Sequence, residues 1–126
     1  MIKKPWQHKN LKESFTGAFR GLVIVFKNER HPKMMTIYGF LTIIFAVSMR
    51  VSLTEIAVLV AIITLVLVAE IFNSIVESVM NIIQPYKDPH IRMLKDISSG
   101  MVLVASLGAV VIGCVIFLPK IILALK

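Results

Sequence analysis

TLVLVAEIFNSIVESVMN, residues 64–81, has the length and apolar character of a membrane-spanning helix, yet polar side chains interrupt it. They stand at offsets of 0, 3, 4, 7 and 11 residues, and we call them the polar stripe: Glu70, Asn73, Ser74, Glu77 and Asn81. On a helix with about 3.6 residues per turn, such positions fall on one face. Glu70 and Glu77 are then about 10 Å apart along the helix axis.

Two carboxylates in an apolar segment require an explanation. Each costs on the order of several kcal/mol unless it is paired, bound to a metal or neutralised. Two interpretations remain open. The stripe forms either a polar seam between helices of a bundle, or a buried site for a cation or a proton transfer. We favour the second, because packing alone does not explain both Glu70 and Glu77.

The composition narrows the protein class. Of the 126 residues, 57% are hydrophobic, and the mean hydropathy is +0.85. A soluble domain of this size cannot enclose so much apolar surface, so we expect one integral membrane domain over residues 1–126. The net charge of +7 favours contact with anionic lipid head groups, and no nucleic-acid partner is expected. The single cysteine, Cys114, excludes a cysteine-based metal site.

An all-α membrane fold is expected. Residues 11–30 repeat apolar side chains at spacings of three and four between charged positions, which predicts an amphipathic surface helix lying flat in the interface. Pro32 is expected to end this helix. Three spans are predicted after it, over about residues 34–49, 56–83 and 97–118, and Pro119 is expected to close the last.

Two polar connections separate the predicted spans. In the first, Ser52 or Thr54 is the expected helix N-cap. In the second, residues 84–95, Pro85 and Pro89 are expected to prevent a helix. Eight Lys and Arg residues precede the first span and three lie in the second connection, against three elsewhere. The positive-inside rule then places the N-terminus and the second connection on the cytoplasmic side of a bacterial inner membrane.

Acidic side chains from several segments are expected to meet at that cytoplasmic interface, namely Glu29, Glu70 and Glu77, with Asp96 close behind. Lys95 and Arg92 bring positive charge to the same level. Carboxylates that hold Mg²⁺, together with cations that neutralise phosphate oxygens, are what phosphoryl transfer requires. A carboxylate set slightly apart could serve as general base for an alcohol.

Common nucleotide and zinc motifs are absent from the sequence. Its six glycines form neither a P-loop nor a dinucleotide-binding turn, so ATP would be bound without a phosphate-cradling loop. No Cys/His cluster indicates zinc. Two other classes remain as alternatives: a non-enzymatic or degenerate membrane protein, and a small ion or drug transporter with intramembrane carboxylates. The transporter is disfavoured because the polar stripe lies near the cytoplasmic end of its span.

Residues 70–77, EIFNSIVE, resemble the E-x-x-N-[ST]-x-x-E signature of the small prokaryotic diacylglycerol kinase family, which includes the undecaprenol kinases. Residues 26–30, FKNER, are similar to the F-K-x-E-R segment that follows the surface helix of the family. Lys95-Asp96 resembles the opening of its third span. The resemblance covers about residues 11–118.

The resemblance implies a homotrimer of three-span subunits with N-terminal surface helices. It also implies that the γ-phosphate of ATP is transferred to a membrane lipid alcohol, diacylglycerol or undecaprenol, at sites shared between neighbouring subunits. Glu70 would then be the general base, and Glu29 and Glu77 would hold the Mg²⁺ that bridges the ATP phosphates.

The remaining implied site residues serve the nucleotide. Asn73 would orient the base or bind nucleotide, and Lys95 and Asp96 would bind ATP phosphate and nucleobase or ribose. Two positions depart from the family pattern, which usually has Asp in place of Asn81 and His-Pro in place of Asp88-Pro89. The lost charge at Asn81 bears more on nucleotide affinity than on the chemistry. The FKNER turn and the basic connection look slightly more like the branch that includes undecaprenol kinases.

Overall fold

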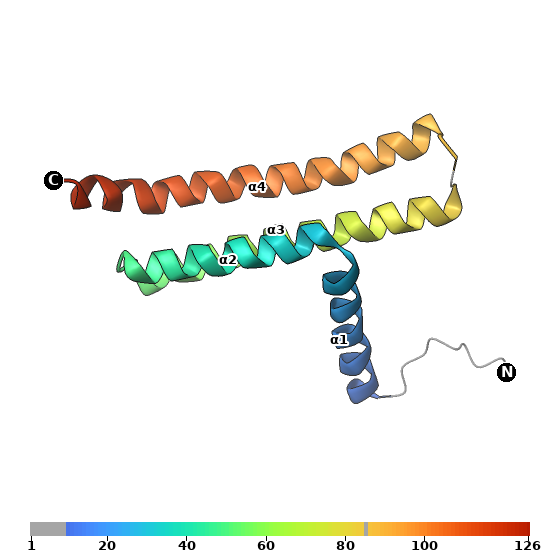
Figure 1. Cartoon of the computed structure of the whole chain (residues 1–126), viewed down its shortest axis with the longest axis horizontal. Coiled ribbons are helices and arrows are strands. Elements are labelled where there is room, and N and C mark those ends of the chain that lie inside the picture. Colours follow the sequence, from blue (N-terminus) through green and yellow to red (C-terminus); the bar gives the residue numbers. More distant parts are fainter. Residues whose placement is uncertain (1–9, 85) are drawn as a thin grey trace.

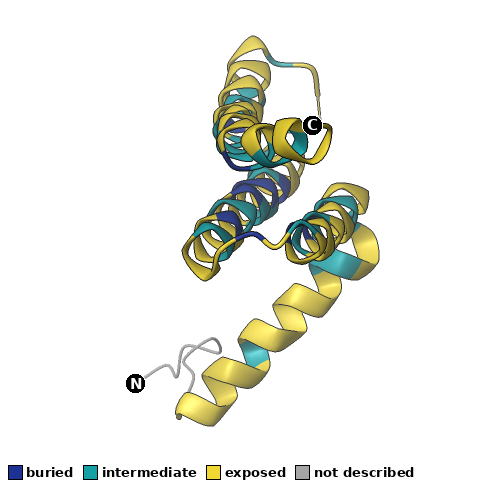
Figure 2. Cartoon of the chain, turned by 90° about the vertical axis from the view of Figure 1, so that its left-hand side faces the viewer, coloured by how far each residue is buried: buried dark blue, intermediate teal, exposed yellow. Residues whose placement is uncertain are grey.

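The computed structural model describes residues 10–84 and 86–126, which form four helices and no strands (Figure 1). These helices are α1 (Leu11–Asn28), α2 (Arg30–Ser48), α3 (Leu53–Ile83) and α4 (Pro89–Ala124). α3 is the central helix, because α2 and α4 each pack along it. α1 contacts α2 and projects away from the other three helices, and none of its residues is buried (Figures 1 and 2). The expected all-α fold is confirmed.

The break between α1 and α2 falls at Glu29, whereas the sequence predicted that Pro32 would end the first helix. Glu29 has an extended backbone, with φ −103° and ψ 130°, and helix adjoins it on both sides. Pro32 lies in the first turn of α2 and is fully buried. A backbone N–H in the first turn has no acceptor within the helix, so a proline there removes no helical hydrogen bond. The surface helix therefore ends at Asn28.

α4 begins earlier than the sequence predicted, at Pro89 rather than near residue 97. The Asp88 carboxylate caps this helix by accepting hydrogen bonds from the backbone N–H groups of His90 (2.7 Å) and Ile91 (3.4 Å). Pro89 therefore starts a helix instead of preventing one, because the first helical position tolerates proline. The first two turns of α4 carry much of what we expected to be an irregular connection.

At the end of the molecule away from the connection between α3 and α4, the start of α3 contacts the last turns of α4. Ser52 is the N-cap of α3, as expected, and it forms a reciprocal capping box with Glu55. The Glu55 carboxylate also lies 3.4 Å from the Lys120 ammonium. Pro119 was expected to end α4, but the helix continues through it to Ala124. Proline there removes one helical hydrogen bond and crowds the preceding turn, yet it does not end the helix, and Lys120 in the following turn contacts α3.

The buried apolar core lies at this same end, where Ala46, Val51, Leu59 and Ile116 pack together. Elsewhere α2 and α3 approach closely at Gly39. A Cβ atom at this position would lie only 2.6 Å from Cγ2 of Ile63. Glycine therefore sets the distance between these two helices.

Two helices of the described chain, α3 and α4, are long and apolar enough to cross a membrane. In the most apolar 18-residue segment of each helix, only 22% of the residues of α3 and 11% of those of α4 are buried. Most of these side chains therefore face outward, as contact with lipid requires. The predicted first span, residues 34–49, lies on α2. The first turn of α2 is polar, and α2 is not among the helices that are long and apolar enough to cross a membrane. A third span therefore stays a prediction.

Candidate active site

The polar stripe forms as predicted on one continuous helix, but its side chains have different environments. Glu70 is 6% exposed and Ser74 is 9% exposed, and the Ser74 hydroxyl donates a hydrogen bond of 3.1 Å to the backbone carbonyl of Glu70. Asn73 is half-buried, whereas Glu77 and Asn81 are exposed. The stripe therefore runs from a buried carboxylate to exposed polar groups near the end of α3.

Two amides of the stripe bind α4. The Ser98 hydroxyl donates a 2.6 Å hydrogen bond to Oδ1 of Asn73, and Ser99 lies 3.5 Å from the same oxygen. Further along, Nζ of Lys95 donates a 2.6 Å hydrogen bond to Oδ1 of Asn81. These contacts fix the register of the start of α4 against the end of α3.

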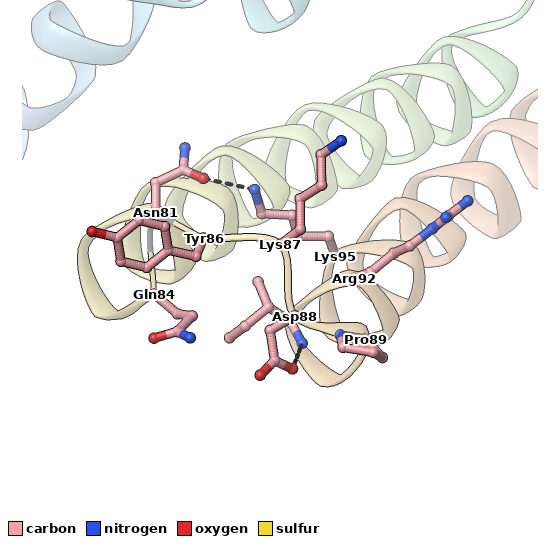
Figure 3. Close-up of a pocket in the computed structure, with 9 residues that line it drawn as sticks. Asn81, Gln84, Tyr86, Lys87, Asp88, Pro89, Arg92 and Lys95 are labelled. Carbon is pink, nitrogen blue, oxygen red and sulfur yellow. Dashed lines mark hydrogen bonds between the residues drawn. The ribbon is translucent and has the colours of Figure 1, made fainter.

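A basic pocket lies where α3 passes into α4, and Figure 3 shows Lys95 reaching across to Asn81 at its edge. The pocket has a volume of about 590 Å³, and Lys87, Arg92 and Lys95 contribute positive charge to its lining. Asp88 is the acidic residue of that lining, and its carboxylate caps α4. The pocket therefore offers net positive charge to an anionic ligand.

A second, smaller pocket of about 240 Å³ lies between α3 and the junction of α1 and α2. Its polar lining consists of Asn28, Glu29, Ser74 and Ser78. Glu29 is half-buried here, at the single non-helical residue between two helices. The break in the helix thus places a carboxylate opposite the hydroxyl groups of α3.

An apolar groove of about 360 Å³ runs between α2 and α3, with Leu67 the lining residue nearest to the polar stripe. The groove and the Glu29 pocket use positions of α3 that repeat at three and four residues, and therefore share one face. Glu70 lines neither of them, but it lies between them along α3, three residues after Leu67 and four before Ser74. Along α3, a buried carboxylate thus follows the residues that line the apolar groove and precedes those that line the polar pocket.

Glu29, Glu70 and Glu77 were expected to meet at one interface, and this expectation stays a prediction. No group of three or more His, Cys, Asp or Glu side chains in the described residues could hold a metal. Glu29 lines its pocket without Glu77, which is exposed. The carboxylate oxygens still suit Mg²⁺, which commonly takes only one or two protein carboxylates beside water and substrate phosphates.

Asp96 lies on the exposed side of α4, where its carboxylate is 3.9 Å from Nε of Arg92. Such an exposed pair holds neither side chain firmly, so both remain available to a ligand. Ser98, which is 3% exposed and contacts Asn73 directly, was not predicted as a site residue. The sequence feature that could have indicated it is its position three residues after Lys95, which places it one helical turn further along the same face.

Known proteins that are similar to this chain identify its family. The family model described as prokaryotic diacylglycerol kinase matches residues 16–117. A protein named diacylglycerol kinase, from Synechocystis sp., is 32% identical over 120 residues, which cover 93% of this chain and 68% of that relative. The matched region contains every candidate site residue described above. The chain therefore belongs to the prokaryotic diacylglycerol kinase family of membrane lipid kinases.

Proposed function

We propose that this protein transfers the γ-phosphate of ATP to the hydroxyl group of a membrane lipid alcohol. The observation that carries the proposal is the burial of Glu70, which is 6% exposed and lies along α3 between Leu67 of the apolar groove and Ser74 of the Glu29 pocket. An amphiphilic acceptor needs an apolar surface for its chain and a polar site for its reacting group. A base between the two can meet the hydroxyl group.

Glu70 is the general base of the proposed reaction. Its carboxylate accepts the proton of the lipid hydroxyl while the hydroxyl oxygen forms a bond to the γ-phosphorus. The bond from that phosphorus to the bridging oxygen breaks, and ADP leaves. Water would compete with the lipid as acceptor, and the burial of Glu70 limits its access.

The nucleotide is assigned to the polar residues around the stripe. Lys95 would neutralise charge on the phosphates, and Asp96 would bind the nucleobase or ribose. Glu29 and Glu77 would hold Mg²⁺, which when bound supplies further positive charge to the phosphate oxygens. Asn73 lies between the two stripe carboxylates along α3 and would orient the base.

We further propose a homotrimer with three spans per subunit and its sites on the cytoplasmic side of the inner membrane. In support, no group of three or more His, Cys, Asp or Glu side chains in the described part of one chain could hold a metal, so a carboxylate from a neighbouring subunit would complete the metal site. A neighbouring subunit would also cover the exposed Glu77, which would be costly to leave facing lipid.

The acceptor is either diacylglycerol, which the name of the relative from Synechocystis sp. indicates, or undecaprenol, which the resemblance in the FKNER segment favours slightly. Purified protein in mixed micelles should be given Mg-ATP with each lipid separately, and both ADP and phosphorylated lipid measured. We expect stoichiometric formation of both products with one of the two lipids. ATP consumption without phosphorylated lipid, or no consumption with either lipid, would contradict the proposal.

A further inference from the structure

Ser98 on α4 makes a hydrogen bond to the polar stripe that is as short as the one from Lys95 to Asn81. Its hydroxyl lies 2.6 Å from Oδ1 of Asn73 and 3.0 Å from the backbone carbonyl of Lys95. A hydroxyl group has one proton, and the shorter distance favours donation to Asn73. The side chain is 3% exposed, so water cannot easily replace this hydrogen bond.

Asn73 is the neighbour of both stripe carboxylates along α3. It follows Glu70 by three residues and precedes Glu77 by four, and helical residues with these spacings lie side by side. Its Oδ1 is occupied by the serine hydroxyl groups of α4. Its amide nitrogen makes no hydrogen bond within the described chain, and it therefore remains available to a carboxylate or a phosphate.

We propose that Ser98 is a positioning residue for the reaction, which acts by holding the Asn73 carboxamide in one orientation. With Oδ1 held by Ser98, the carboxamide keeps one orientation, and its two N–H bonds point away from that hydroxyl group on a side chain whose neighbours along α3 are Glu70 and Glu77. This inference rests on the proposed kinase function and adds to it the residue that orients Asn73. Ser99 approaches the same oxygen at 3.5 Å from an exposed position, and it contributes less.

The contact also links the two ends of the site. Ser98 lies one turn beyond Lys95 on α4, and Lys95 holds Asn81 two turns beyond Asn73 on α3. The contacts of the Asn73 amide and of the Lys95 ammonium therefore both join the start of α4 to the end of α3. A shift of α4 along α3 would displace both groups together.

The test compares Ser98→Ala with Ser106→Ala, a control about two turns further along α4 whose side chain makes no hydrogen bond within the described residues. Loss of one hydrogen bond should lower kcat of the Ser98 variant roughly 3- to 10-fold and leave KM for Mg-ATP nearly unchanged. In an Asn73→Ala background, Ser98→Ala should cause no further loss, because its effect acts through Asn73. A multiplicative loss in that background would overturn the proposal.

A second measurement does not require activity. In protein labelled with ¹⁵N, the side-chain amide signal of Asn73 should shift or broaden in Ser98→Ala and stay unchanged in Ser106→Ala. An unchanged signal in the Ser98 variant would overturn the positioning role even in an active enzyme. If the wild-type protein phosphorylates neither lipid, the kinase proposal fails, and this signal still decides whether Ser98 orients Asn73.

Discussion

The Lys95 ammonium on α4 donates a 2.6 Å hydrogen bond to the side-chain oxygen of Asn81 on α3. The family pattern usually carries Asp at the position of Asn81, and a contact between that Asp and Lys95 would be an ion pair. Asn81 keeps the geometric tether and leaves the charge of Lys95 uncancelled. Together with Lys87 and Arg92, Lys95 gives the basic pocket its positive charge.

This relationship predicts the effect of Asn81→Asp. The new carboxylate would pair with Lys95 and cancel part of the attraction to ATP phosphates, so KM for Mg-ATP should rise several-fold with little change in kcat. The measurement is an ATP titration at saturating lipid and Mg²⁺, with Ser106→Ala as the control. A lower KM would mean that a carboxylate at position 81 assists metal binding. It would contradict the view that Asn81 serves to leave the charge of Lys95 available to ATP.

The proposed metal ligands give a second prediction. Glu29→Gln and Glu77→Gln each remove one hard anionic oxygen while keeping the size of the side chain. Activity should fall by orders of magnitude and depend more steeply on Mg²⁺ concentration, with folding little affected. Rates should be measured across a Mg²⁺ titration. Near-normal rates of both variants at limiting Mg²⁺ would show that other groups hold the metal.

Assembly provides a third prediction. Because the described residues of one chain contain no group of three or more acidic, His or Cys side chains that could hold a metal, the complete site should require neighbouring subunits, and the protein should be a trimer in mild detergent. Native mass measurement and crosslinking test this directly. Fully active protein that remains monomeric by both methods would contradict a shared site.

The close approach of α2 and α3 predicts the effect of Gly39→Ala. The added Cβ would lie 2.6 Å from Cγ2 of Ile63, so the helices must separate, at a cost of about 1–3 kcal/mol. Unfolding in micelles should occur at a lower temperature than in the wild type, and Ile63→Ala in the same chain should restore part of the loss. Gly21→Ala is the control, because no atom lies within 4 Å of its added Cβ. Equal stability of the Gly39 and Gly21 variants would exclude the clash.

The polar stripe and the four helical segments could be predicted because both follow from periodicity within a single helix. The boundaries drawn at Pro32, Pro89 and Pro119 were wrong, since proline is compatible with a first helical turn and α4 continues through Pro119 to Ala124. Periodicity assigns a face to each helix but not the rotation and register of two helices against each other.

The contacts between helices were therefore the part that sequence could not supply. The hydrogen bond from Ser98 to Asn73 depends on the register of α4 against α3, and nothing in either segment alone specifies it. The same limit applies to Glu29 and Glu77. A common depth in the membrane was expected for both, whereas their environments within one chain differ.

The assignment of Glu70 as the base and Glu77 as a metal ligand is tested most directly by a pair of ATP titrations in saturating lipid. Glu70→Gln keeps the size of the side chain but cannot accept the proton of the alcohol. It should lower kcat strongly and leave KM for Mg-ATP nearly unchanged, whereas Glu77→Gln should mainly raise that KM. If Glu70→Gln mainly raises KM and Glu77→Gln mainly lowers kcat, the two roles are reversed; if neither variant changes either constant, the account is contradicted.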